Sequence, residues 1–411
     1  MSIQAGVTGL NYVSLNNLFK HFNMTTLNGV SIKKFSGANG GTEYFFIIEA
    51  PVTGDFNSQL QSLENRYAEA LQSVALMPDS AIFRRIFVSD VLNQAPTVER
   101  SSLVQETPQH PVAVSIIEQQ PLRGEKIALF AYHVITPSPC VKHRLSPQHL
   151  LVEFGGQRHL WSTQLYVDSA ESRLSAETQT HEIFDNLIGV LAKERATLLD
   201  NCLRTWIYLK DVDVFYHGMV KARNDLFTQH NLTKDSHYIA STGIEGACAS
   251  PNSLVTMDAY SVLDLVPKQV SHLNDFNKLC LAHDYEVAFE RATRVDYADR
   301  SHYFISGTAS IDNTGNVVHL MDVIAQLDRA LENVEALLVA GDANLNDMMY
   351  LFVYLRDATD YPAVSAHLSK RLPNLPTLIV HGPVCRPEWL IEIEGVAVAT
   401  QSHPDMPLFC N

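Results

Sequence analysis

The sequence lacks the features that distinguish nucleic-acid-binding, membrane-spanning and secreted proteins. Lys and Arg number 30 against 45 Asp and Glu, and the resulting formal net charge of −15 disfavours binding to a phosphate backbone. No apolar run approaches the roughly 20 residues of a spanning helix. The opening segment, MSIQAGVTGLNYVSL, has no basic stretch followed by an apolar one, so no signal peptide is evident. We therefore expect neither nucleic acid nor a membrane as a partner.

Motifs for metals, nucleotide cofactors and disulfides are also missing. The 17 histidines form no HxH or HExxH pattern, and neither GxGxxG nor a GxxxxGK segment occurs. The cysteines are scattered without a CxxC pair, at positions 140, 202, 248, 280, 385 and 410. Such spacing argues against a zinc site and against a disulfide framework. We expect a reduced, cytoplasmic protein with no metal and no cofactor.

The composition is that of a globular protein with an ample core. Of the 411 residues, 46% are hydrophobic and 18% are charged, which excludes disorder for most of the chain. The length suggests two to four compact units rather than one.

The last third of the chain, from His302 to Thr400, contains a clear succession of predicted elements. Two β-rich runs, YFISGTASI and VVHL, flank the turn DNTGN and predict a hairpin. Apolar residues at helical spacing follow in MDVIAQLDRALENVEALLVAG, and Gly341 closes that helix. Next come the buried strand MMYLFVYLRD, the helix YPAVSAHLSKRL, and the strands TLIVHGPV and LIEIEGVAVA. The predicted order is β-β-α-β-α-β-β.

The same order recurs in the rest of the chain. In the middle third, HLWSTQLYV, THEIFDNLIGVLAKERA, CLRTWIYLKD, VFYHGMVKARNDLFTQH and SLVTMDAYSVL follow it. The first third follows it more faintly, with EYFFIIEA, SLENRYAEALQSVAL, AIFRRIFVSD, PVAVSIIEQ and KIALFAYHVI. The chain is therefore predicted to be three α+β units, covering residues 1–140, 141–275 and 276–411.

The third unit resembles the RidA superfamily through SGTASI, through the stretch from DVIAQLDRALENVEALLVAG to LFVYLRDATDY, and through EIEGVAVA. Small members of that superfamily are homotrimers with active sites in the clefts between subunits. The resemblance implies that three RidA-like units form an intrachain pseudo-trimer with its sheets inside and its helices outside. Because the interfaces of a trimer would already be satisfied within one chain, we expect a monomer or a weak dimer.

Imine deaminases of this superfamily hold the substrate carboxylate with an Arg in a Pro-x-Arg turn. The corresponding places here begin at Pro376, Ile239 and Pro111, and no Arg lies in the neighbouring stretch of any unit. Thr or Ser cannot replace the charge and the forked donors of a guanidinium. Plain hydrolysis of 2-imino acids is therefore not expected.

The stretch from about residue 155 to 400 resembles another branch of the superfamily, the chorismatases, which remove pyruvate from chorismate. The matching segments are RTWIYL (204–209), KARNDLF (221–227), STGIEG (241–246), FERAT (289–293), SGTASI (306–311) and CRPEWLIEIEGV (385–396). Ile207, Ala222 and Glu245 stand where that branch usually has Asn, Gly and Gly.

The resemblance implies a small anionic substrate and an enzyme that releases pyruvate from chorismate or a related enolpyruvyl acid. The other product would be a hydroxybenzoate or a dihydrodiol. The alternative is a RidA-like protein that only binds a small molecule, or a degenerate member of the endoribonuclease or deaminase type. The net charge of −15 opposes the ribonuclease interpretation.

Two residues are the candidates for chemistry. Cleavage of the enol ether needs a general acid, and burial in the apolar strand LIEIEGVAVA would raise the pKa of Glu392. Strand alternation places Glu394 on the same face, and its negative charge would raise the pKa of Glu392 further. The alternative is that either Glu is an exposed residue in an ion pair. Cys385 lies beside Arg386, which would favour a thiolate; an inert core cysteine is the other interpretation.

The remaining candidates would bind the substrate in a pocket between the second and third units, and each also has a purely structural interpretation. Arginines would neutralise a dianion, Tyr208 would donate a hydrogen bond, and Gly243 would allow close backbone approach. Thr308 lies in a segment that could offer backbone donors, and the resemblance places Gln326 near the cleft. The full predicted set is Arg386, Arg291, Arg294, Arg223, Tyr208, Gly243, Thr308 and Gln326.

Overall fold

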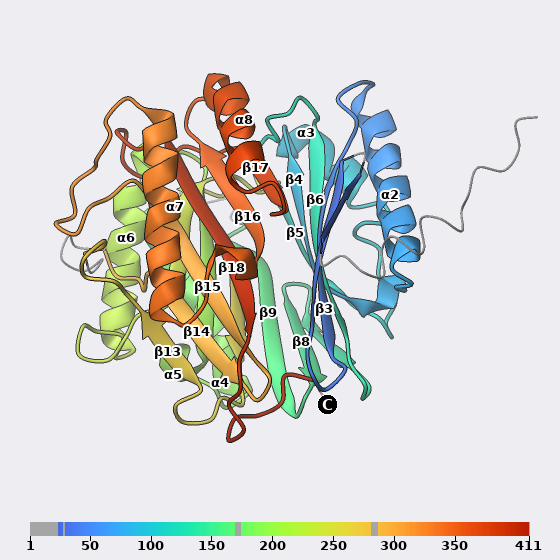
Figure 1. The fold of residues 1–411 in the computed structure, drawn as a ribbon, viewed down its shortest axis with the longest axis vertical. Helices are drawn as coiled ribbons and strands as arrows, with labels where there is room; N and C mark the ends of the chain where they lie inside the picture. Colours follow the sequence, from blue (N-terminus) through green and yellow to red (C-terminus); the bar gives the residue numbers. More distant parts are fainter. Residues whose placement is uncertain (1–23, 28, 169–173, 281–286, 411) are drawn as a thin grey trace, which may run out of the picture.

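The computed structural model describes residues 24–27, 29–168, 174–280 and 287–410 (Figure 1). The opening segment, for which no signal peptide is predicted, lies outside these residues. The described strands form three six-stranded mixed sheets, each drawn from one continuous stretch of the chain.

The first sheet has the strand order β1-β2-β3-β6-β4-β5. Its strands are β1 (Met24–Leu27), β2 (Val30–Ser36), β3 (Thr42–Glu49), β4 (Ala81–Val88), β5 (Ala113–Glu118) and β6 (Ile127–Ile135). The helices between them are α2 (Phe56–Ser73), the 3-10 helix η1 (Pro78–Ser80) and α3 (Val91–Val98). The sequence did not predict α3, because its eight residues are too few to show a helical period and include Pro96.

The second sheet has the order β11-β10-β12-β9-β8-β7. Its strands are β7 (Val141–Ser146), β8 (His149–Phe154), β9 (Gln157–Tyr166), β10 (Cys202–Leu209), β11 (Ala240–Glu245) and β12 (Val255–Val262). Its helices are α4 (Ala176–Lys193), α5 (Leu198–Asn201) and α6 (Val212–Gln229).

The third sheet has the order β13-β14-β15-β18-β16-β17. Its strands are β13 (Val270–Leu273), β14 (Ala292–Tyr297), β15 (Arg300–Ala309), β16 (Met348–Leu355), β17 (Thr377–His381) and β18 (Ile391–Thr400). Its helices are α7 (Val323–Ala340), η3 (Leu345–Asp347), η4 (Ala358–Asp360) and α8 (Tyr361–Arg371). Strand β13 precedes the unit boundary predicted at 275, and the unit boundaries remain predictions.

The predicted β-β-α-β-α-β-β order is present in all three sheets, with one additional strand in front: β1, β7 or β13. One local prediction was wrong. The hairpin partner of β15 is β14, while Val317 of VVHL contacts Ile311 only through an isolated bridge. The segment STGIEG forms strand β11, which is parallel to β10 because α6 returns the chain.

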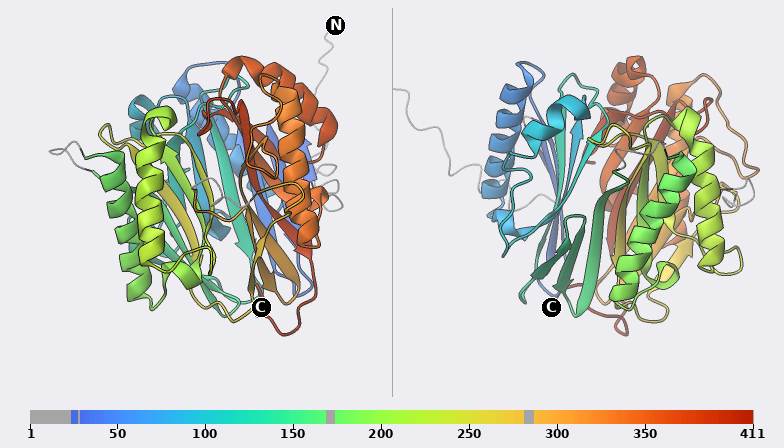
Figure 2. Two further views of the ribbon diagram at one scale, coloured as in Figure 1. Left: turned by 90° about the vertical axis from the view of Figure 1, so that its left-hand side faces the viewer. Right: turned by 180° about the vertical axis from the view of Figure 1, so that it is seen from behind.

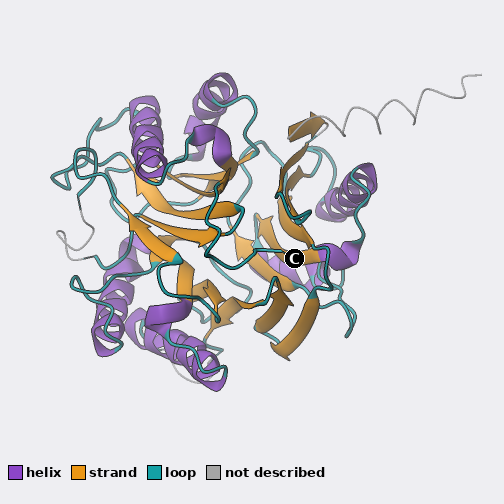
Figure 3. Cartoon of the chain, turned by 60° about the horizontal axis from the view of Figure 1, so that its bottom comes forward, coloured by secondary structure: helices purple, strands orange, loops and turns teal. Residues whose placement is uncertain are grey.

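The helices lie outside and the sheets face one another inside, as predicted (Figures 1 and 2). Seen end-on, the strands gather toward the middle with the long helices on the periphery (Figure 3). Helix α7 illustrates the local cause: Val323, Leu327, Leu331 and Val334 are buried at helical spacing. The side chain of Asp322 accepts from the backbone of Ala325 and caps its first turn.

No helix of the described residues is long and apolar enough to cross a membrane. We still predict a monomer or a weak dimer, because the three sheets already cover one another within the chain. Light scattering at three times the mass of 45.8 kDa would contradict this prediction.

Candidate active site

A pocket opens between the second and third sheets and contains about 570 Å³ of empty space continuous with solvent. From the second sheet and α6 it is lined by Tyr216, Arg223, Ser241, Thr242 and Gly243. From the third unit it is lined by Val287, Phe289, Arg291, Gly307, Ala309, Ile311, Cys385, Arg386, Trp389 and Glu392.

The surroundings of Glu392 do little to stabilise the charged form of its carboxyl group. Its side chain makes no hydrogen bond with the part of the chain that the structure describes, yet it is 95% buried (5% exposed) beside the pocket. Burial, and then the charge of Glu394, raise the pKa of Glu392 to about 8, against the opposing effects of Arg204 and Arg291. At neutral pH this carboxyl group therefore holds a proton.

Glu394, two residues along the same strand, has the opposite environment. Its carboxylate accepts from Arg204 and Thr242, from Trp206 Nε1 at 3.0 Å and from the Tyr354 hydroxyl at 2.8 Å. The Arg204 guanidinium also forms an ion pair with this carboxylate. The two carboxyl groups are thus divided into a proton holder, Glu392, and a fixed anion, Glu394.

The first unit contributes to the same buried charge network. The Arg85 guanidinium lies 4.0 Å from Glu394 Oε1 and 3.0 Å from Asp258 Oδ2. It also stacks over Trp206, with 4.7 Å between the guanidinium carbon and the ring centre. One ionic network therefore joins all three sheets directly behind the pocket.

Gly307 leaves the space that the Glu392 carboxyl group occupies. A Cβ atom at position 307 would lie 2.2 Å from Glu392 Oε1, well inside van der Waals contact. The Gly307 amide meanwhile donates to the Thr242 hydroxyl at 2.9 Å across the two sheets.

Gly307→Ala is expected to displace the Glu392 carboxyl group and to lower any activity that depends on it by about 10²-fold, a loss that misplacement by about 1 Å can cause. Gly189→Ala on α4 is the matched control, because no atom lies within 4 Å of a Cβ built there. Initial rates and thermal unfolding of both variants would test this. Full activity of Gly307→Ala would contradict the geometry.

Cys385 lines the pocket, and of its two interpretations the thiolate is wrong. Burial, followed by the charge of Glu392, raises the pKa of the Cys385 thiol to about 12, and the nearby Arg386 lowers it too little to compensate. Cys385 is therefore a neutral wall of the pocket at physiological pH.

Three of the four predicted arginines converge on the pocket. Arg291 donates to the Cys280 carbonyl at 3.1 Å and lies over the Phe289 ring. Arg386 donates to the Gly315 carbonyl at 3.0 Å and lies over the Trp389 ring. Arg223 reaches the pocket from the buried face of α6. Anchored guanidinium groups around a neutral acid suit an anionic ligand.

The fourth arginine and two other predicted residues, Tyr208 and Thr308, lie elsewhere. Arg294 pairs with Asp296 at 2.6 Å, so its charge is already neutralised outside the pocket. Tyr208 is buried beside Arg85 in the core, 5.6 Å from the guanidinium carbon to the ring centre. Thr308 donates to the Ser306 carbonyl at 2.8 Å, because strand alternation turns it away from the pocket.

Gln326 acts on the pocket indirectly. Its side chain accepts from the Leu390 backbone at 2.8 Å and donates to the Glu388 carbonyl at 2.9 Å. It thereby holds the segment that carries Trp389 into the lining. Gly243 does line the pocket, as part of strand β11.

Sequence reasoning missed Thr242, Tyr216 and Trp389 as site residues. Thr242 and Trp389 lay within the recognised motifs STGIEG and CRPEWLIEIEGV, so the motifs were a usable signal. No sequence pattern pointed to Arg204 or Trp206 as partners of a Glu about 190 residues away. Glu245, which stands where the chorismatases usually have Gly, has a structural role: its carboxylate accepts a hydrogen bond from the Val212 amide at 3.1 Å and caps α6.

Only the third unit carries the acid. Glu392 pairs with Tyr354, the seventh residue of β16. The corresponding seventh residues of β10 and β4 pair with Thr256 and Ala128, neither of which can hold a transferable proton at neutral pH. Of the three clefts that a pseudo-trimer offers, one therefore has a carboxyl group at this position.

In the described residues, one group has the composition of a metal site: Glu177, His181 and Asp225, on α4 and α6. None of the three lines the pocket. Nothing in the pocket lining itself groups His, Cys and carboxylates as metal ligands.

Comparison with known proteins gives likenesses of three kinds: a family model, a curated relative and a solved structure. The family model described as Endoribonuclease L-PSP matches residues 289–399. The 3-aminoacrylate deaminase RutC of Acinetobacter baylyi is 31% identical over 96 residues, which are 23% of this chain and 76% of that protein. A chorismatase crystal structure aligns over 86% of this chain and 98% of its own, with a TM-score of 0.60 and 17% identity. The last likeness is one of fold.

Proposed function

This chain belongs to the RidA superfamily, and from that premise we propose that its pocket releases pyruvate from chorismate or a related enolpyruvyl acid. The observation that carries the proposal is Glu392, a protonated carboxyl group in a pocket with three arginines. The shared fold with a chorismatase and the ordered segment resemblance over 155–400 support it.

The arrangement suggests how the enol ether would break. Glu392 donates its proton to the enolpyruvyl methylene carbon, which becomes a methyl group and leaves an oxocarbenium ion. Water adds to that cationic carbon, and its released proton returns to the Glu392 carboxylate. The resulting hemiketal collapses to pyruvate and the ring alcohol. Glu394 stays charged nearby and keeps the proton on Glu392 before the substrate binds.

Arg223, Arg291 and Arg386 would hold the two substrate carboxylates. Two come from the third unit and one from α6 of the second, so the substrate would bridge the units. The rings of Tyr216, Phe289 and Trp389 and the neutral thiol of Cys385 would surround the ring of the substrate.

A pocket wall of this kind would determine whether the ring product forms by hydrolysis or by aromatisation. We therefore expect Cys385→Ala to change the ratio of the two ring products more than the total amount of pyruvate.

The direct test is incubation of the protein with chorismate while pyruvate is followed through lactate dehydrogenase and NADH. Stoichiometric pyruvate release would support the proposal, and chromatography of the ring product would distinguish a hydroxybenzoate from a dihydrodiol. Binding of chorismate without pyruvate would favour the alternative of a protein that only binds its ligand.

The pH dependence should follow the proton on Glu392. A general acid works only when protonated, so kcat/KM for chorismate is expected to fall about tenfold per pH unit above about pH 8. A profile between pH 6 and 10 in a constant-ionic-strength buffer checks this. A rate that stays level through pH 9.5 would exclude Glu392 as the acid.

A further inference from the structure

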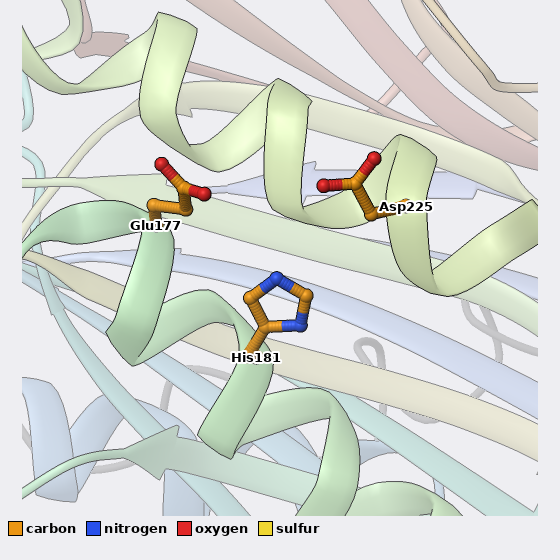
Figure 4. A group of neighbouring side chains, drawn as sticks. All are labelled: Glu177, His181 and Asp225. Atoms are coloured by element: carbon orange, nitrogen blue, oxygen red, sulfur yellow. The ribbon is translucent and has the colours of Figure 1, made fainter. Parts of the chain in front are cut away.

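The outer surface of the second unit holds three potential metal ligands between two parallel helices. Glu177 and His181 lie one turn apart on α4, and Asp225 lies on α6. Figure 4 shows the three side chains extending into the space between the helices, with the His181 ring between the two carboxylates. One ligand atom from each residue lies within 4.8 Å of the others.

The chemistry and the spacing fit a transition metal of intermediate softness. Residues four apart on a helix present their side chains on the same face, an arrangement that metal sites in helical proteins use. In a tetrahedral zinc site with bonds of about 2.1 Å, ligand atoms are about 3.4 Å apart. The cluster would have to contract by little more than 1 Å, which side-chain rotation allows. The imidazole distinguishes it from a purely acidic surface patch, which would bind such ions less selectively.

The cluster already binds a positively charged side chain of the same chain, that of Lys221. The Lys221 ammonium, one turn before Asp225, donates to the Glu177 carboxylate. Lys221 is exposed and flexible enough to move aside, so a divalent ion would replace one positive charge with two at the same place.

We infer that Glu177, His181 and Asp225 form a surface site for a divalent transition-metal ion such as Zn²⁺, which ties α4 to α6. Water would complete the coordination, as in other sites with three protein ligands. The site is separate from the proposed substrate pocket and does not depend on the proposed function.

The site has a structural consequence for the pocket. Helix α6 supplies Arg223 to the pocket lining from the turn that also carries Lys221 and Asp225. The two helices approach closely at Gly218, where a Cβ atom would lie 3.3 Å from the Glu177 backbone nitrogen. An ion that joins Glu177 to Asp225 would hold α6 against α4 at this contact, and would make the position of Arg223 more rigid.

The experiment uses the full chain, freed of metal with a chelator that is then removed. Zn²⁺ is titrated by calorimetry, and Co²⁺ binding is followed by its visible absorption. The wild type is expected to bind one Zn²⁺ tightly, and His181→Ala to bind it at least tenfold more weakly, because even second-shell partners of metal ligands contribute 10- to 100-fold. Lys221→Met removes the competing ammonium and is expected to tighten binding.

His143→Ala is the control, because His143 is an exposed histidine on β7 of the second sheet, 3.7 Å from the Glu153 carboxylate and outside the cluster. It should bind Zn²⁺ like the wild type, and Zn²⁺ should raise the unfolding temperature of both but not that of His181→Ala. The inference is overturned if His181→Ala binds Zn²⁺ and gains stability as the wild type does. It is also overturned if the wild type binds no Zn²⁺ and Lys221→Met binds none either.

Discussion

Glu392→Gln is expected to slow pyruvate release from chorismate by about 10²-fold or more, the usual contribution of general acid catalysis. Gln has nearly the shape of a protonated Glu but no transferable proton, so chorismate should bind with little change. Single-turnover rates and equilibrium binding, measured separately, would show a loss in the chemical step alone. If this variant turned over chorismate at the wild-type rate, the general acid would have to be another residue.

The same variant makes a second measurable change, in stability. The pKa of Glu392 is about 8 in the folded chain and 4.5 for an ordinary Glu, so the folded state binds the extra proton between these values. The stability of the wild type should therefore decrease as the pH rises through this window, and this decrease should be smaller in Glu392→Gln. Urea unfolding at pH 5 and pH 9 would detect the difference. An identical pH dependence in both proteins would mean that Glu392 titrates normally.

Glu394→Gln is expected to lower the free energy of unfolding by about 3–5 kcal/mol, the usual cost of removing one partner of a buried ion pair. The substitution leaves the Arg204 guanidinium, which is 1% exposed, without its counter-charge. It also removes the anion from donors that Trp206 and Tyr354 direct at it. Urea unfolding at pH 7 would measure the loss.

Glu392→Gln is the matched control for this prediction as well. It is the same chemical change two residues away on the same strand, at a carboxyl group without a hydrogen-bonding partner in the described part of the chain. We expect it to keep or increase stability at pH 7. If the two variants lost the same stability, the division into a proton holder and a fixed anion would be wrong.

Most of the fold could be predicted because its evidence is local. The long helices α4, α6 and α7 each have 18 residues with a continuous apolar face, and the strands β4, β10 and β16 are buried over their whole length. Three repetitions of one element order then indicated three similar units. The predictions failed where local evidence is short or ambiguous: α3 has eight residues, and the partner of β15 is set by pairing rather than by composition.

The site could be predicted only in part. Glu392, Cys385, Arg223, Arg291, Arg386 and Gly243 do line one pocket, and the quoted motifs were sufficient to select them. Arg294 was selected with equal reason, but Asp296, two residues along the strand, neutralises it. The sequence left the protonation state of Cys385 open between a thiolate and a neutral thiol, because a neighbouring Arg says nothing about burial, which is the larger effect here.

The sequence by itself determined the repeated α+β architecture, the acidic surface and the presence of a carboxyl pair on one strand face. The tertiary structure alone decided which carboxyl group keeps its proton. Glu394 accepts hydrogen bonds from Arg204, Trp206 and Thr242 of the second sheet, whereas Glu392 keeps its proton because it is buried, in the space that Gly307 leaves, beside the charge of Glu394. These partners lie between about 85 and 190 residues away in the chain, and the free energy of a buried charge depends on such neighbours rather than on adjacent residues.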